Sequence, residues 1–159
     1  MRSLIKDGVL KASDCIIKTK NKSIFNKRYT IGMCIDIKGN IDFTIIEKAL
    51  KSIKFNKFMN KINKNNKVIF MDNATIHKNF LFKNDIIKNN WNIIYNIPYH
   101  SHLNPIEYIF SLLRKKLLDE NNHTLNDIIN IIVTFKKNIN KQFVTNIFNK
   151  CLNEIKIIV

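Results

Sequence analysis

The sequence predicts an α/β fold in which a mixed sheet is flanked by helices. Short apolar runs typical of strands alternate along the chain with segments whose apolar residues recur about every three to four positions, as in amphipathic helices. Between residues 68 and 95 a strand-like run, a helix and a second strand-like run follow one another directly. This order is that of a βαβ unit, which almost always crosses over with a right hand.

The composition favours one globular domain with a polyanionic partner. The chain has 159 residues and is 45% hydrophobic, which is enough for one domain with a substantial core. Lys and Arg number 27 against 12 Asp and Glu, for a net charge of +15. Such an excess favours nucleic acid or an anionic membrane surface, although the richness in Asn, Ile and Lys also matches the bias of an AT-rich genome.

Cysteine usage and hydropathy predict an intracellular protein that does not span a membrane. Cys15, Cys34 and Cys151 are odd in number and lack metal-binding spacing, so we interpret them as free thiols in a reducing compartment. Nothing resembles a signal peptide, and no apolar run approaches the roughly 18 residues that a membrane span needs.

The first half of the chain predicts a hairpin and a helix. Residues 1–28 form a poorly defined N-terminal segment with one β-like run, Cys15 to Ile17. The β-rich runs Tyr29 to Asp36 and Ile41 to Ile46 flank Lys38-Gly39-Asn40, which indicates a β-hairpin. Apolar residues at helical spacing then predict an amphipathic helix over about residues 52–64.

The second half supplies the βαβ unit and three further helices. Val68 to Met71 is apolar without alternation, as in a strand buried on both faces, and a helix over 78–89 leads to a strand over 91–95. The next helix begins with Asn104 as N-cap and Pro105 at its first position. The last two helices are expected over residues 124–137 and 139–153.

Two carboxylates carry the functional prediction. Asp72 ends the buried strand, at the edge of an α/β sheet where ligand sites form, and Glu107 lies just inside the later helix. Each also has a structural alternative. Asp72 in Asp72-Asn73 could cap a loop, and Glu107 could complete a capping box with Asn104.

Other polar residues near these acids suggest weaker possibilities. Glu107 shares a helix face with Arg114, and Lys115 and Lys116 continue a basic segment beside it. His100-x-His102 is a weak zinc signal without cysteine partners, and His77 is better explained by packing or by support of a neighbouring residue.

Two motifs resemble signatures of the DDE transposases of the Tc1/mariner and IS630 group. They are Asp72-Asn73-Ala74-Thr75-Ile76-His77 and the run from Pro98 to Glu107, Pro-Tyr-His-Ser-His-Leu-Asn-Pro-Ile-Glu. The 34 residues between Asp72 and Glu107 match the Tc1-like interval between the second and third acids of the family. The resemblance covers about Tyr29 to Leu118.

The resemblance implies an RNase H-like mixed sheet with flanking helices. Residues 29–120 would form the core, and residues 121–159 would add helices packed on it. Asp72 and Glu107 would be the second and third catalytic acids and would hold two Mg²⁺ or Mn²⁺ ions. Asn73 and His77 would support Asp72, and Asn104 would orient the helix start.

The resemblance also implies partners and a location. The partners are DNA, as transposon ends and target, with a homodimer as an open option and with no membrane. Arg114, Lys115 and Lys116 would contact the DNA, and the location would be nuclear. The implied reaction is metal-dependent DNA cleavage and strand transfer in transposition.

The chain departs from the family pattern in its N-terminal part. The family's first Asp lies on a central strand well upstream of the hairpin, so the chain resembles an N-terminally truncated domain whose sheet lacks that strand. Residues 12–18 are the expected replacement for the strand, and Asp14 for the acid, although an ordinary loop Asp is favoured. For Asp36 we prefer an exposed strand position.

Three hypotheses follow. The chain is a fragment of a DDE transposase, active or inactive; or it is a catalytically dead, basic DNA-binding remnant; or it is an unrelated basic nucleic-acid-binding protein in which both acids are only caps.

Overall fold

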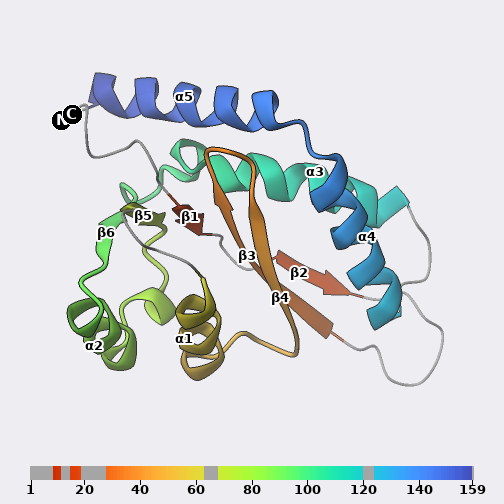
Figure 1. The fold of residues 1–159 in the computed structure, drawn as a ribbon, viewed down its shortest axis with the longest axis horizontal. Coiled ribbons are helices and arrows are strands. Elements are labelled where there is room, and N and C mark those ends of the chain that lie inside the picture. Colours follow the sequence, from red (N-terminus) through yellow and green to blue (C-terminus); the bar gives the residue numbers. More distant parts are fainter. Residues whose placement is uncertain (1–8, 12–14, 19–27, 63–67, 120–123, 159) are drawn as a thin grey trace.

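The computed structural model of the protein describes residues 9–11, 15–18, 28–62, 68–119 and 124–158 (Figure 1). The strands are β1 (Val9–Lys11), β2 (Cys15–Lys18), β3 (Arg28–Asp36), β4 (Ile41–Glu47), β5 (Val68–Met71) and β6 (Asn92–Tyr95). The α-helices are α1 (Ser52–Lys61), α2 (Phe80–Lys88), α3 (Pro105–Asp119), α4 (Leu125–Asn138) and α5 (Lys141–Ile158). Two 3₁₀ turns, η1 (Thr75–His77) and η2 (Ser101–Leu103), precede α2 and α3.

The six strands form one mixed sheet. Its order is β2-β3-β1-β5-β6, and β4 pairs with the other side of β3. The hairpin β3–β4 is antiparallel, with Tyr29 opposite Glu47 and Ile35 opposite Ile41. β5 and β6 are parallel, with Val68 level with Asn92 and joined through α2, so the expected βαβ unit is confirmed.

The central position of the sheet is occupied, which corrects one detail of the prediction. Val9–Lys11, rather than residues 12–18, lies between β3 and β5, antiparallel to the first and parallel to the second. The predicted run Cys15 to Ile17 is a strand but pairs only with β3, where Cys15 is opposite Ile31. The position between β3 and β5 is therefore filled by three residues.

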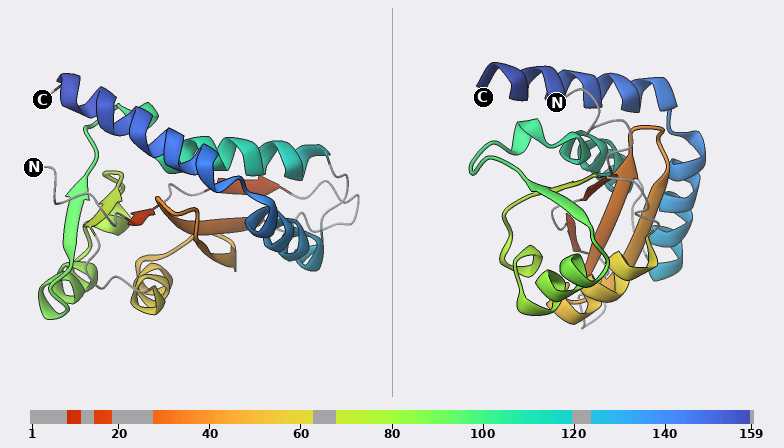
Figure 2. Two further views of the ribbon diagram at one scale, coloured as in Figure 1. Left: turned by 45° about the horizontal axis from the view of Figure 1, so that its top comes forward. Right: turned by 60° about the vertical axis from the view of Figure 1, so that its left-hand side comes forward.

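Helices cover both faces of the sheet, and each face has its own apolar core (Figure 2). On one face α3, α4 and α5 pack on alternate residues of β3, namely Ile31, Met33 and Ile35. On the other face α1 and α2 pack on β5, and Cys34 of β3 points to that side. The period of two along β3 thus divides its side chains between the two cores.

Several element predictions need adjustment. In β5 only Ile69 and Met71 are fully buried, so this strand is less enclosed than its continuous apolar pattern suggested. The helix expected from residue 78 begins two residues later, after η1, because Asn79 accepts a hydrogen bond from Phe82 N and caps α2. The last helix continues to Ile158. None of the helices in the described part of the chain is long and apolar enough to span a membrane.

Asp36 is buried rather than exposed, which contradicts our prediction for it. Its carboxylate accepts hydrogen bonds from Lys38 N (3.0 Å), Asn40 N (2.9 Å) and Asn40 Nδ2 (2.8 Å). Gly39 takes the positive φ of 79° that the turn requires. The strand pattern could not reveal this role, because it depends on the turn: the carboxylate accepts hydrogen bonds from the N–H groups of Lys38 and Asn40.

Replacing Asp36 with Ala should destabilise the fold by about 2–3 kcal/mol, because two backbone N–H groups of the turn lose a charged acceptor. The measurement is the free energy of unfolding in urea. The matched control is Asp42→Ala on β4, since Asp42 is exposed and its ion pair with the exposed Lys136 spans 4.0 Å. Equal stability of the two variants would contradict the role assigned to Asp36.

Candidate active site

Asp72 follows the last residue of β5 and is half-buried. Its Oδ1 lies 2.6 Å from His77 Nδ1 and accepts a hydrogen bond from Ala74 N at 3.0 Å. The second contact is the loop-capping interaction that we considered as the structural alternative, and the first adds an acid–imidazole pair. The carboxylate is therefore fixed in direction by groups on one of its oxygens.

His77 supports Asp72 from the protein interior. Its side chain is only 1% exposed, and its ring packs on Phe55 with centroids 4.9 Å apart. The Tyr95 hydroxyl donates to the His77 carbonyl at 2.9 Å, and burial raises the pKa of Tyr95 above its ordinary value. Phe55 of α1 thus packs on the imidazole, Tyr95 of β6 fixes the backbone of His77, and the imidazole in turn orients the carboxylate.

Asn96 links the ends of the two parallel strands and the loop that follows. Its N–H donates to the Met71 carbonyl (2.7 Å), and its own carbonyl accepts from Asn73 Nδ2. Its side-chain Oδ1 accepts from Ile97 N (2.9 Å) and Nδ2 donates to the His100 carbonyl (2.7 Å). All four hydrogen-bonding groups of this 7% exposed residue are used.

Glu107 lies in the first turn of α3, and the start of this helix argues against a capping box. The Asn104 N–H, which the Glu107 side chain would have to reach, already donates to the Ser101 carbonyl at 2.9 Å. Asn104 accepts from Ile106 N through Oδ1 at 3.4 Å and from Glu107 N through its carbonyl at 3.0 Å. Asn104 Nδ2 is buried, and within the described residues it has no hydrogen-bond partner.

The topology brings the Asp72 edge and the Glu107 helix to the same region. α3 packs against η2 and against β1, the parallel neighbour of β5. Asp36 belongs elsewhere: Val9 pairs with both Asp36 and Ile69, so Asp36 is level with a residue three positions before Asp72. That offset is about 10 Å along the strands.

A third acid is not gathered with these two in the part of the chain that the structure describes. None of the residues of β1, Val9, Leu10 and Lys11, is acidic. Asp14 lies outside the described residues. No group of three or more His, Cys, Asp or Glu side chains with metal-binding geometry occurs among the described residues, and this includes the region of His100 and His102.

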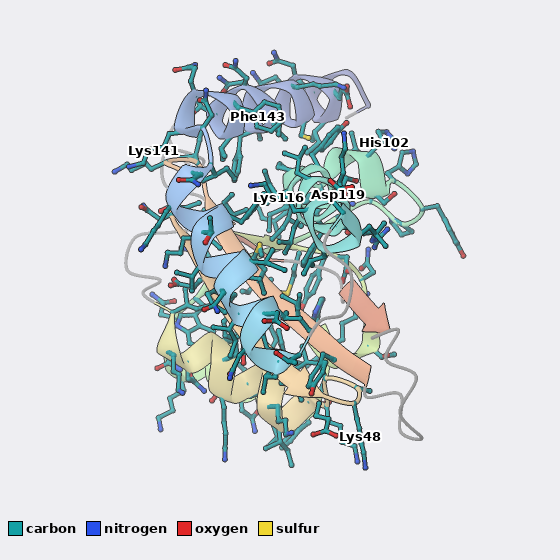
Figure 3. The ribbon with its side chains drawn as sticks, turned by 90° about the vertical axis from the view of Figure 1, so that its right-hand side faces the viewer. Lys48, His102, Lys116, Asp119, Lys141 and Phe143 are labelled. Atoms are coloured by element: carbon teal, nitrogen blue, oxygen red, sulfur yellow. The ribbon has the colours of Figure 1, made fainter. Side chains whose placement is uncertain are left out.

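The basic residues expected to contact DNA are on the outer surface of α3. Arg114, Lys115 and Lys116 are all exposed. Lys115 and Lys116 border a cleft of about 480 Å³ between α3, α4 and α5, with Asp119 and Phe143 on its margin (Figure 3). Neither Asp72 nor Glu107 lines this cleft, so it is separate from the acids.

α5 contacts the loop that leads to Glu107. Cys151 Sγ donates to the His102 carbonyl at 3.5 Å, and the side chain is 1% exposed. Burial, followed by the negative charge of Glu154, raises the pKa of this thiol to about 11. Cys151 is thus a protonated packing residue.

A protein-family comparison identifies the chain. The family model described as DDE superfamily endonuclease matches residues 13–129, which is most of the chain. The chain belongs to this family. The match includes both motifs that carried the predicted resemblance, and that prediction is confirmed. No curated protein matches the sequence.

Solved structures confirm the RNase H-like fold. The catalytic domain of Mos1 mariner transposase is 14% identical, with a TM-score of 0.74 over 90% of this chain and 76% of that one. A Mos1 strand transfer complex gives a TM-score of 0.77 at 13% identity, over 92% of this chain and 51% of that one. The Mos1 catalytic domain with raltegravir and Mg gives 0.73 at 14% identity, over 97% and 84%. The chain thus spans about half the length of the transposase in the strand transfer complex.

Sequence reasoning missed Asn96 as the connecting residue of this DDE-family site. The available signal was its position directly after the second parallel strand, because the carboxyl ends of parallel strands share one edge of the sheet. Tyr95 was assigned only to a strand, although its hydroxyl holds the Asp72 loop.

Asn96→Asp tests the connecting role. The change keeps the shape of the side chain but places a carboxylate oxygen against the His100 carbonyl, where a donor now lies. We expect a loss of about 2–3 kcal/mol in the free energy of unfolding in urea. Asn92→Asp, at an exposed position of β6, the strand that Asn96 follows, is the control and should cost little. Equal effects of the two substitutions would refute the assignment.

Proposed function

We propose that this chain is a DNA-cleaving and strand-transferring domain of the transposase type, with Asp72 and Glu107 as its catalytic carboxylates. The observation that carries the proposal is the hydrogen-bonded path from Asp72 to the Glu107 helix through Asn73, Asn96 and the His100 loop. Family membership supports the chemistry, and the related Mos1 proteins have been solved in a paired end complex and a strand transfer complex.

The residues at this edge suit a hard divalent cation. Mos1 has been solved with Mg and with Mn, and carboxylate oxygens are the ligands that these ions prefer. The contacts of Asp72 Oδ1 with His77 and Ala74 would orient this carboxylate for an ion. Asp72 and Glu107 would hold Mg²⁺ or Mn²⁺, which would supply a Lewis acid and a more acidic bound water.

The protein's own residues would provide orientation and charge. His77 holds the Asp72 carboxylate, and its burial against Phe55 prevents the imidazole from turning away. The Asn104 carbonyl and Oδ1 fix the first turn of α3, from which Glu107 projects. Asn104 and His77 are therefore positioning residues, because each would act by orienting a carboxylate.

DNA is the proposed partner, as transposon ends and target. Its phosphates would meet the exposed basic side chains of Arg114, Lys115 and Lys116, and the net charge of +15 favours such a polyanion. The proposal includes action in the nucleus and leaves room for a homodimer.

A second function, DNA binding without cleavage, is favoured by one observation. The central strand β1 carries no acid beside β5, so the described part of the site contains two carboxylates rather than three. A site with fewer carboxylates would hold its ions more weakly, while the basic surface of α3 would be unaffected.

Cleavage is tested by nicking of supercoiled DNA in the presence of Mn²⁺. Asp72→Asn and Glu107→Gln should each lower the nicking rate by about 100-fold or more, since each removes a metal-binding charge. Asp119→Asn, on the exposed last turn of the same helix as Glu107, should nick at the rate of the unaltered chain. Asp14→Asn belongs in the same series, because it asks whether that residue supplies a third carboxylate.

The outcomes separate the candidates. Equal nicking by the unaltered chain and by both acid variants would overturn the catalytic assignment. No nicking by the unaltered chain, together with DNA binding that weakens as salt rises, would favour the DNA-binding function instead.

A further inference from the structure

Tyr99 is fully exposed in the loop between β6 and α3, which projects from the body of the molecule in the right-hand view of Figure 2. The exposed fraction of its side chain is 103%. Within the described residues the ring has no hydrogen bond, ion pair or ring contact. A large aromatic side chain is thus presented entirely to solvent.

The backbone holds Tyr99 in a conformation that bulky residues rarely adopt. Its φ is +64°, and His100 N donates to the Ile97 carbonyl at 3.2 Å across the turn. Pro98 and Tyr99 are the two central residues of this turn, and the second of these positions, with positive φ, favours Gly or Asn. Such a residue persists only where surrounding contacts enforce it.

Those contacts come from the residues that build the candidate active site. Asn96 bonds to both ends of the turn, through Ile97 N and the His100 carbonyl. His100 Nδ1 lies 2.8 Å from the Pro98 carbonyl and closes the turn from the other side. The strained position is therefore fixed to the same side chain that connects the Asp72 edge with the Glu107 helix.

Two further flat rings follow Tyr99 in the chain. His102 is exposed and His100 half-exposed, and their rings are 5.4 Å apart at the centroids. His102 lies on the segment that leads into α3, at the margin of the molecule in Figure 3. The loop thus gathers an aromatic ring and two imidazoles within four residues, immediately before the Glu107 helix.

We propose that Tyr99 is a stacking platform for an unpaired DNA base next to the phosphodiester that is cleaved, an inference that rests on the proposed function. Every base has a flat face, and aromatic side chains bind single-stranded DNA by stacking on it. An apolar protein partner is disfavoured because the three residues that follow Tyr99, His100-Ser101-His102, are polar and the chain carries a charge of +15. Tyr99 would contact the substrate, whereas Asn96 and His100 position it.

The experiment measures binding of the full chain to two labelled DNAs in EDTA, so that cleavage plays no part. One is a blunt duplex, and the other carries a short single-stranded extension that contains 2-aminopurine, whose fluorescence falls on stacking. Tyr99→Asn removes the ring and suits the left-handed backbone, so it should melt at or above the temperature of the unaltered chain. Tyr99→Phe retains the ring.

We expect Tyr99→Asn to bind the extended DNA about tenfold more weakly and to lose the fluorescence change, with Tyr99→Phe unchanged. All three chains should bind the blunt duplex equally. Equal affinity of Tyr99→Asn for the extended DNA, or an equal loss on both DNAs, would overturn the stacking role, as would failure of the unaltered chain to bind the extended DNA. The binding experiment needs no nicking, so its outcome is independent of the nicking assay on the acid variants. Tyr99 can prove to stack on a base even if Asp72 and Glu107 prove not to be catalytic, and the reverse result is equally distinguishable.

Discussion

The arrangement of the site depends on Asn96, which connects the loops after β5 and β6 through one buried side chain and its own peptide groups. Through Met71 and Asn73 it fixes the loop after β5, and through Ile97 and His100 it fixes the loop after β6. A buried amide whose groups are all paired is rigid, because losing any one bond leaves an unsatisfied polar group. Asn96 thus connects the loop that carries Asp72 with the loop that leads into α3.

The sheet register determines which acids can act together. Parallel pairing of β1 with β5 places the ends of these strands at one edge, and α3 lies against β1 there. The same register places Asp36 towards the other edge, where it organises the hairpin turn. Two buried or half-buried aspartates thus have different tasks, and their position along the strands, rather than their burial, separates them.

Much of this was predictable from sequence, since periodicity and helix caps are local. The hairpin, the βαβ unit and the start of α4 after Thr124 follow from residues close together in the chain. The strand that fills the centre of the sheet was harder to predict, because Val9-Leu10-Lys11 is too short for a pattern and its place is set by β3 and β5. Asn96 was missed because two of its four hydrogen-bond partners, Met71 and Asn73, are distant in the sequence, and such bonds leave no periodic signal.

For Asp72 and Glu107 the sequence predicted the position of each acid, but not the contacts of its neighbours. Asp72 could be singled out as the end of a buried strand, but the Ala74 contact shows that the structural and functional explanations of one carboxylate are compatible. Glu107 could be placed in a first turn, yet only the structure shows that the Asn104 N–H is already occupied by Ser101. Whether Glu107 caps the helix or is a candidate metal ligand could therefore be decided only from the hydrogen-bond partner of the Asn104 N–H.

The central claim is that Asp72 and Glu107 share a divalent ion, and calorimetric titration of Mn²⁺ tests it most directly. The unaltered chain, Asp72→Asn, Glu107→Gln and the double variant are compared. If the two acids hold the same ion, each single substitution should weaken binding nearly as much as both together, since loss of either ligand disrupts the shared site. Additive losses in the double variant, or Mn²⁺ affinity that no substitution changes, would contradict the account.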